Sequence, residues 1–131
     1  MQMDDSPRAD LVPTSATVDP CALARQVIRT EAAALMQLAN SLPVEFANAT
    51  QTIFRCPATV IFTGIGKAGL IARKLVATFG STGTPAHFLH PSEAVHGDLG
   101  RIHSQDIIIL LSYSGETEEI TRLIPALKQL D

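Results

Sequence analysis

Residues 59–69 read TVIFTGIGKAG, and this stretch decides the fold. Its first five residues are β-branched or aromatic, which favours a strand, and glycines follow at positions 64, 66 and 69. The apolar residues beyond the glycines recur at helical spacing: Ile71, Ala72, Leu75 and Phe79. The pattern predicts a strand over about 58–63, a glycine turn, and a helix over about 67–80.

The glycine turn predicts an anion site. Such a connection aims free backbone N–H groups and the positive end of a helix dipole at the carboxyl edge of the sheet. Lys67 lies in the first helical turn, where a cation opposes the dipole, so helix stabilisation does not explain it. We interpret Lys67 as a residue that meets an anionic ligand. The alternative is a solvated surface lysine.

A second bend follows a second buried run. Residues 106–111 read DIIILL and are apolar on both faces, which is typical of a central strand in a parallel sheet. They lead directly into SYSGET at 112–117, where the hydroxyls of Ser112, Ser114 and Thr117 surround a glycine. Because one hydroxyl is enough to cap a helix, three of them indicate an oxyanion cradle.

The remaining segments predict a leader without periodicity, further helices, one more strand and one polar loop. In chain order we expect a disordered leader over 1–18, helices over about 19–42 and 43–56, a short strand over 86–89, a polar loop with two histidines over 90–100, and a last helix from about 115. Pro125 should kink or end that last helix.

Strands that alternate with helices predict an α/β fold with a parallel sheet and right-handed crossovers. If the first and third strands are neighbours, the two bends face each other across the crevice where such sheets bind ligands. Three strands make a small sheet and leave the apolar third strand at an edge. We therefore expect two further strands beyond this chain.

Composition excludes several functions. The 131 residues carry a net charge of −3 without a basic cluster, which argues against nucleic acid, and no apolar run is long enough to cross a bilayer. The two cysteines lack the paired spacing of a zinc site or disulfide, and the N-terminus does not resemble a signal peptide. We expect a cytoplasmic protein with neither a nucleic-acid nor a membrane partner.

Other motifs leave alternatives open. Gly64-x-Gly66-x-x-Gly69 matches a dinucleotide fingerprint, but no acidic residue ends the second strand to hold a ribose. His90 and His96 lie in the loop beside the crevice and could bind a sugar hydroxyl, move a proton or hold a metal.

Three acids begin the last helix, namely Glu116, Glu118 and Glu119. Each could simply stabilise the helix dipole, and one could serve as a general base. The sequence does not choose among them.

From about residue 20 to residue 131 the chain resembles the sugar-isomerase (SIS) domain of D-arabinose-5-phosphate isomerases. The matching segments are GIGKAG at 64–69, ATFGSTGTP at 77–85, HPSEAVHGDLG at 90–100 and SYSGETEEI at 112–120. The histidine-containing segment is the most specific of these, because the serine-rich loop alone would indicate only some SIS domain.

The resemblance implies a three-layer sheet of the SIS or flavodoxin-like type and interconversion of D-ribulose 5-phosphate and D-arabinose 5-phosphate through an enediol. This reaction would supply the Kdo sugar of lipopolysaccharide. By resemblance the catalytic positions are Lys67, His96 and Glu119, and the substrate-binding positions are Gly83, Thr84, His90, His96, Ser112, Ser114 and Thr117. No cofactor is required, and His90 is also a position for an inhibitory zinc.

The chain also departs from the family pattern. Family members continue through two more strands, a downstream catalytic histidine and a pair of CBS modules, and they assemble as homotetramers. We therefore expect 19–131 to be a partial SIS domain that self-associates and has little activity by itself. The alternatives are a non-catalytic module that binds a sugar phosphate and an inactive remnant.

Overall fold

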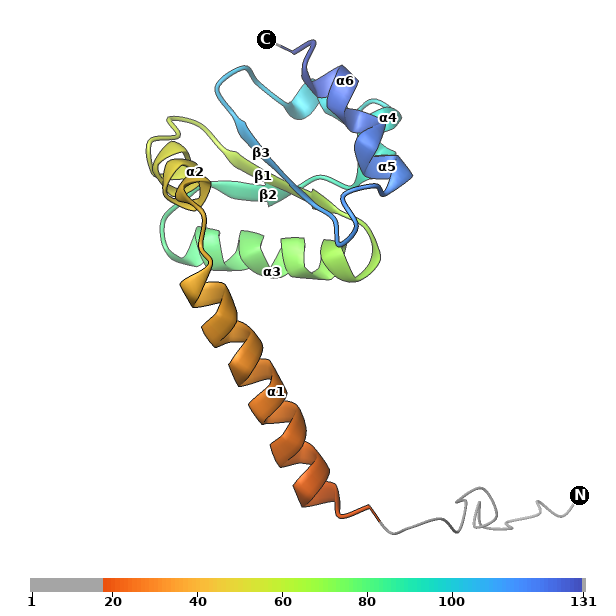
Figure 1. The fold of residues 1–131 in the computed structure, drawn as a ribbon. Coiled ribbons are helices and arrows are strands. Elements are labelled where there is room, and N and C mark those ends of the chain that lie inside the picture. The colour runs from red at the N-terminus through yellow and green to blue at the C-terminus, as the bar shows by residue number, and fades with distance from the viewer. Residues whose placement is uncertain (1–17, 131) are drawn as a thin grey trace, which may run out of the picture. The chain divides into compact units, whose positions relative to one another are not determined.

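The computed structural model describes residues 18–130, which divide into two units after Pro43 (Figure 1). The expected leader lies outside the described residues except for its last position. The first unit contains helix α1 (Pro20–Asn40). The side chain of Asp19 accepts a hydrogen bond from the backbone N–H of Cys21 at 2.9 Å, and Pro20 follows as the first helical residue. This start was predicted from the sequence.

The second unit is an α/β fold with three parallel strands, as predicted. Its elements are α2 (Val44–Phe54), β1 (Val60–Gly64), α3 (Gly66–Ser81), β2 (Ala86–Phe88), α4 (Pro91–Val95), the 3-10 helix η2 (Asp98–Arg101), β3 (Ile107–Leu111), α5 (Glu118–Thr121) and α6 (Leu123–Leu127). The strand order is β2-β1-β3, so the first and third strands are neighbours. The crevice expected from that order can therefore form.

Helices cover both faces of the sheet, with α3 on one face and α4, α5 and α6 on the other (Figure 1). The alternation of side chains along β1 explains the two layers. Val60 and Phe62 pack toward α3, where the rings of Phe62 and Phe79 meet edge to face at 5.0 Å. Ile61 points to the opposite face and packs with Leu123 of α6.

The central strand is β1, whose five residues are all buried. The apolar run 107–111 forms β3 instead at an edge of the described sheet, where all five residues are only half-buried. Its pattern is typical of a central strand, but in the described sheet β3 has a neighbour, β1, on one side only. The edge position expected for a three-stranded sheet is confirmed.

The segment 90–100 is more ordered than the polar loop we expected. It contains α4 and most of η2, because Pro91 fits the first turn of a helix and the imidazole of His90 caps that turn. The last helix is interrupted at Arg122, between α5 and α6. Pro125 has no N–H to bond the carbonyl of the preceding turn, and the predicted disruption is thus confirmed.

Asp106 ties the starts of β1 and β3 together. Its two carboxylate oxygens accept hydrogen bonds from the backbone N–H groups of Thr59, at 2.9 Å, and His103, at 2.8 Å. The strands then run in register until Gly64 pairs with Leu111. This register decides which residues meet at the far end of the two strands.

Candidate functional site

The two bends predicted from the sequence leave the sheet side by side. Gly64 and Leu111, the last residues of β1 and β3, are paired in the parallel ladder. The glycine bend after β1 and the hydroxyl bend at 112–117 therefore share the carboxyl edge of the sheet. This edge is where open parallel sheets bind ligands.

Close packing of backbone fixes the glycine bend. A Cβ atom on Gly69 would lie 2.7 Å from the carbonyl oxygen of Gly64, and one on Gly64 would lie 3.0 Å from the backbone of Ala68. Only glycines allow α3 to begin this close to the end of β1. The first turn of α3 then carries Lys67, whose side chain is exposed.

Side-chain hydrogen bonds fix the hydroxyl bend. The hydroxyls of Ser112 and Thr117 lie 2.8 Å apart, and Ser112 Oγ also accepts from the N–H of Gly115 at 3.0 Å. Ser114 Oγ accepts from the N–H of Glu116 at 3.1 Å. Since Ser112 and Thr117 share one hydrogen between them, one hydroxyl hydrogen of that pair and the one on Ser114 are left to donate to an anion.

A hollow of about 470 Å³ lies where the two bends meet. Its lining residues come from α3, from β3 and from the start of the hydroxyl bend: Lys67, Ala68, Ile71, Leu110, Leu111, Ser112 and Tyr113. The structure thus brings together two of the predicted site residues, the ammonium of Lys67 and the hydroxyl residue Ser112. One cation beside hydroxyl donors is an arrangement suited to a phosphate or carboxylate.

The two loop histidines stand at opposite ends of α4. The half-buried imidazole of His90 caps the helix, because its Nδ1 accepts from the N–H of Ser92 at 3.2 Å, and its ring meets Phe88 edge to face. His96 follows the last residue of α4 and is exposed. Neither histidine lines the hollow, although α4 contacts α5, which carries Glu119.

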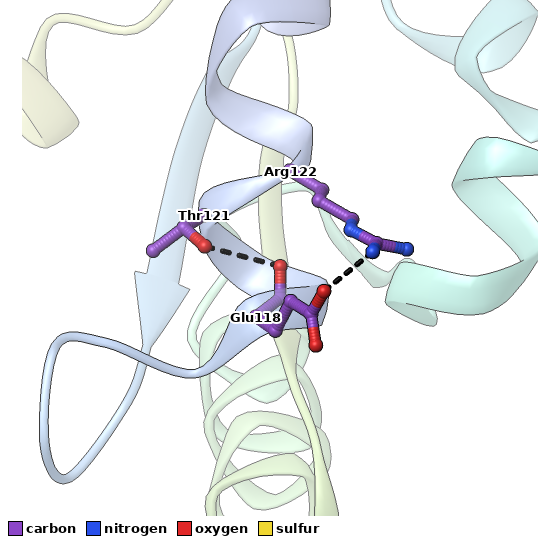
Figure 2. Close-up of polar contacts among 3 residues, drawn as sticks. All are labelled: Glu118, Thr121 and Arg122. Carbon is purple, nitrogen blue, oxygen red and sulfur yellow. Dashed lines mark hydrogen bonds and ion pairs between the residues drawn. The ribbon is translucent and has the colours of Figure 1, made fainter.

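The three acids of the last helix differ in their surroundings. Figure 2 shows Glu118 paired with the guanidinium of Arg122, while its backbone carbonyl accepts from the hydroxyl of Thr121 at 3.1 Å. Among residues 18–130 neither Glu116 nor Glu119 forms an ion pair. Glu119 is exposed in the first turn of α5, two residues after Thr117. The spacing of Glu118 and Arg122 on one helical face was a signal available in the sequence.

Gly83 and Thr84 lie at the other end of the sheet. They follow the last turn of α3 and precede β2, and Thr84 donates its N–H to the carbonyl of Phe79 at 2.9 Å. A helix of 16 residues is about 24 Å long and separates them from the glycine bend. One copy of the chain does not bring them into the hollow, and their binding role stays a prediction.

The donor set around His90 does not suit zinc within one chain. In the part of the chain that the structure describes, no three side chains of His, Cys, Asp or Glu are grouped as metal ligands. Zinc at His90 thus stays a prediction that the described residues do not support.

No helix among residues 18–130 is long and apolar enough to span a bilayer.

His87 in β2 is the histidine with a shifted pKa. Burial lowers the pKa of its imidazole below the ordinary value of 6.5, the charge of Arg101 lowers it further, and Asp106 opposes both. Its Nε2 is buried without a hydrogen-bond partner among the described residues. We interpret His87 as a neutral structural residue of the sheet.

The apolar lining of the hollow was not predicted from the sequence. Ala68, Ile71, Leu110 and Leu111 were expected only as helix and strand positions, and Tyr113 only as a member of the hydroxyl run. Tyr113 could have been noticed, since an aromatic residue between two serines at the tip of a polar bend has no core to fill.

Comparison with known proteins places these residues in context. The model of the SIS domain family matches residues 53–131. A protein of Haemophilus influenzae named probable arabinose 5-phosphate isomerase is 49% identical over 81% of this chain and 32% of its own length. The arabinose 5-phosphate isomerase KdsD of Yersinia pestis is 50% identical over 80% of this chain and 32% of its own. The chain thus spans about a third of these relatives.

A solved structure gives the same picture. The structure of an E. coli CFT073 protein in complex with arabinose 5-phosphate superposes with a TM-score of 0.77 and 44% sequence identity. The match covers 86% of this chain and 62% of that one. The three-stranded α/β unit described above is therefore shared with a protein solved with a ligand in place.

Proposed function

The chain belongs to the SIS domain family, and from this premise we propose that it carries the sugar-phosphate site of an aldose–ketose isomerase. The proposed reaction interconverts D-arabinose 5-phosphate and D-ribulose 5-phosphate. One observation carries the proposal, namely the shared hollow of Lys67 and Ser112 at the carboxyl edge of the sheet. The names of the relatives and the ligand of the E. coli structure support the choice of substrate.

The chemistry requires a base, a proton donor and an electrostatic partner for the enediol. In the aldose-to-ketose direction, a base removes the proton from C2 while O1 gains a proton, and the electron pair of the C–H bond forms the C1–C2 double bond. Protonation at C1 and loss of the O2 proton then give the ketose. We assign Glu119 as the base, His96 to the hydroxyl protons and Lys67 to the developing oxyanion.

In this proposal the hydroxyl bend binds the phosphate group of the substrate. Ser112, Ser114 and Thr117 surround Gly115, which takes the positive φ of 74° that the bend requires. Two hydroxyl hydrogens are free to donate there, as the hydrogen bonds of the bend require. The anionic end of the substrate would thus be fixed beside α5, the helix that carries Glu119.

The first test measures binding and proton exchange on this chain. We expect arabinose 5-phosphate to bind and its C2 proton to exchange with deuterium from the solvent, followed by NMR. Glu119→Gln should abolish exchange and leave binding intact, whereas Lys67→Met should weaken binding about tenfold or more. Failure of the unmodified chain to bind the sugar phosphate would contradict the proposal.

Matched controls lie on the same helices. Glu118→Gln makes the same charge change one residue before Glu119, at a side chain already paired with Arg122. Lys74→Met removes an exposed cation of α3 that does not line the hollow. Both variants should bind and exchange as the unmodified chain does. Equal loss in Glu118→Gln and Glu119→Gln would contradict the assignment of the base.

A second candidate function is binding without turnover. It is favoured because neither Glu119 nor His96 lines the hollow, and both side chains are exposed. The same experiment separates the two functions. Binding with no C2 exchange in any form of the chain would favour the module that only binds.

We also propose that the protein self-associates, with a tetramer as the expected assembly. Within its own unit no residue of α1 is buried, although the helix carries an apolar set: Leu23, Val27, Ile28, Leu35, Met36 and Leu38. An apolar set of this kind needs to be covered, and we assign that role to a second copy of the chain. Light scattering coupled to gel filtration should give a mass above 14.0 kDa, the mass of one chain, and a monomer at micromolar concentration would contradict the proposal.

A further inference from the structure

Tyr113 combines two properties that rarely occur together in one aromatic residue. It is fully exposed, at 106% of its reference surface, and it lines the hollow that holds Lys67 and Ser112. Aromatic side chains usually bury a large apolar surface, so a tyrosine with no packing partner at the mouth of a hollow is poorly explained by folding. In the described part of the chain it serves no core.

The lining of the hollow has a polar part and an apolar part. Lys67 and Ser112 supply the cation and the hydroxyl, whereas Ala68, Ile71 and Leu110 supply carbon surface. Ile71 is itself 52% exposed, so the carbon surface reaches the mouth of the hollow. A ligand that fits both parts has an anionic end and a body with C–H groups. A sugar phosphate has this composition, and inorganic phosphate lacks the body.

We propose that Tyr113 is a specificity residue that contacts the carbon chain of the bound sugar phosphate. Its ring would cover the C–H face of the sugar while the hydroxyl bend holds the phosphate. A tyrosine suits this contact, because its ring gives a large amphipathic surface and only two side-chain torsions need to be fixed. The inference rests on the proposed function for the nature of the ligand.

The hydroxyl bend connects this contact to phosphate binding. Tyr113 lies between Ser112 and Ser114, and the bond from Ser112 to Thr117 closes the bend on its other side. An anion that engages these hydroxyls therefore also fixes the backbone that carries the ring. The aromatic contact would then be made with little further loss of conformational freedom.

The chain provides its own probe for this inference. Tyr113 is its one tyrosine, and it contains no tryptophan. Tyrosine fluorescence of the unmodified chain thus reports on this residue alone. We expect the emission to change on titration with arabinose 5-phosphate, and to change far less with inorganic phosphate at the same occupancy.

Substitution then tests the effect on selectivity by calorimetry. Tyr113→Ala should weaken binding of arabinose 5-phosphate by about three- to tenfold and leave the affinity for inorganic phosphate unchanged. Tyr113→Phe should retain most of the affinity for the sugar phosphate. Phe54→Ala removes another exposed aromatic residue, 88% exposed on α2 and not part of the lining, and should change neither affinity.

The outcomes separate this inference from the function on which it rests. If Tyr113→Ala leaves both affinities unchanged, the specificity role is wrong and the phosphate site stands. If it weakens both ligands equally, the residue acts on the bend and not on the sugar, and the inference is again wrong. If the unmodified chain binds phosphate but not the sugar phosphate, the proposed function fails together with the inference.

Discussion

The two bends at the carboxyl edge reach the same place by different means. Backbone packing holds the glycine bend, where the approach of Gly69 to Gly64 leaves no room for a methyl group. Side-chain hydrogen bonds among Ser112, Ser114 and Thr117 hold the hydroxyl bend, whose tip is exposed. One wall of the hollow is therefore rigid and the other can be rearranged by competing hydrogen bonds. A ligand would meet a cation carried on a rigid backbone and an adjustable set of donors.

The largest expected effect comes from crowding the rigid bend. Gly69→Ala would place a Cβ atom 2.7 Å from the carbonyl oxygen of Gly64, and backbone on both sides prevents an easy adjustment. Overpacking of this kind costs about 3 kcal/mol. We expect urea unfolding to show that loss, together with weakened binding of arabinose 5-phosphate, because Lys67 moves with α3.

Gly80 provides the matched control for this variant. It lies in the same helix, and a Cβ atom there would meet nothing within 4 Å. Gly80→Ala should be neutral or stabilise the protein by up to about 1 kcal/mol, since alanine favours the helix. Similar losses of stability in both variants would contradict the claim that the glycine bend is a packing device.

The next effect concerns the register of β1 with β3, which brings the two bends to the same edge of the sheet. In Asp106→Asn one carboxylate oxygen becomes an NH₂ group, which cannot accept from the backbone N–H of Thr59 or His103. We expect a loss of about 2 kcal/mol in the free energy of unfolding. Asp98→Asn should cost less than about 1 kcal/mol, because the pair of Asp98 with Arg101 is exposed. Equal costs would show that Asp106 does not hold the strands.

The same contrast explains what the sequence could predict. The glycine bend follows from local steric rules, so residues 59–79 predicted the strand, turn and helix together. The neighbour of a strand is not a local property, which is why the apolar run 107–111 suggested a central strand and is found at an edge. A histidine that caps α4 lies outside the usual set of capping residues, and so the helix after His90 was missed.

The candidate site shows the same limit. Lys67 and the hydroxyl bend were predicted because each belongs to a contiguous motif. Their shared hollow depends on the pairing of β1 with β3. The sequence predicted the meeting of the two bends only if these strands were neighbours, and it could not predict that they are. The choice among the three acids depends on where each side chain points, and the structure separates only Glu118 by its partner Arg122.

A smaller effect should follow from loosening the adjustable bend. Ser112→Ala removes the contact with Thr117 and the acceptor for the N–H of Gly115, at a cost of about 1 kcal/mol. Ser114→Ala removes the one contact with the N–H of Glu116 and should cost less. Phosphate affinity, measured by calorimetry, should fall more in Ser112→Ala, because Ser112 lines the hollow. The reverse order would contradict the account of this wall.

The smallest expected effect concerns His87, which lies in β2 outside both bends, and the pH dependence of the free energy of unfolding. Burial and Arg101 keep the pKa of His87 below 6.5 in the folded protein, so the unfolded chain binds more protons as the pH falls through that value. The contribution of His87 to stability is therefore fully present above pH 6.5 and is lost as the pH drops toward the lowered pKa.

The variant His87→Gln tests this dependence. Glutamine does not titrate, so the free energy of unfolding should change less with pH in this range. Urea unfolding between about pH 5 and 8 measures the slope, and Ser114→Ala should retain it, because that change leaves β2 untouched. A slope that persists in His87→Gln would contradict the assignment of this titration to His87.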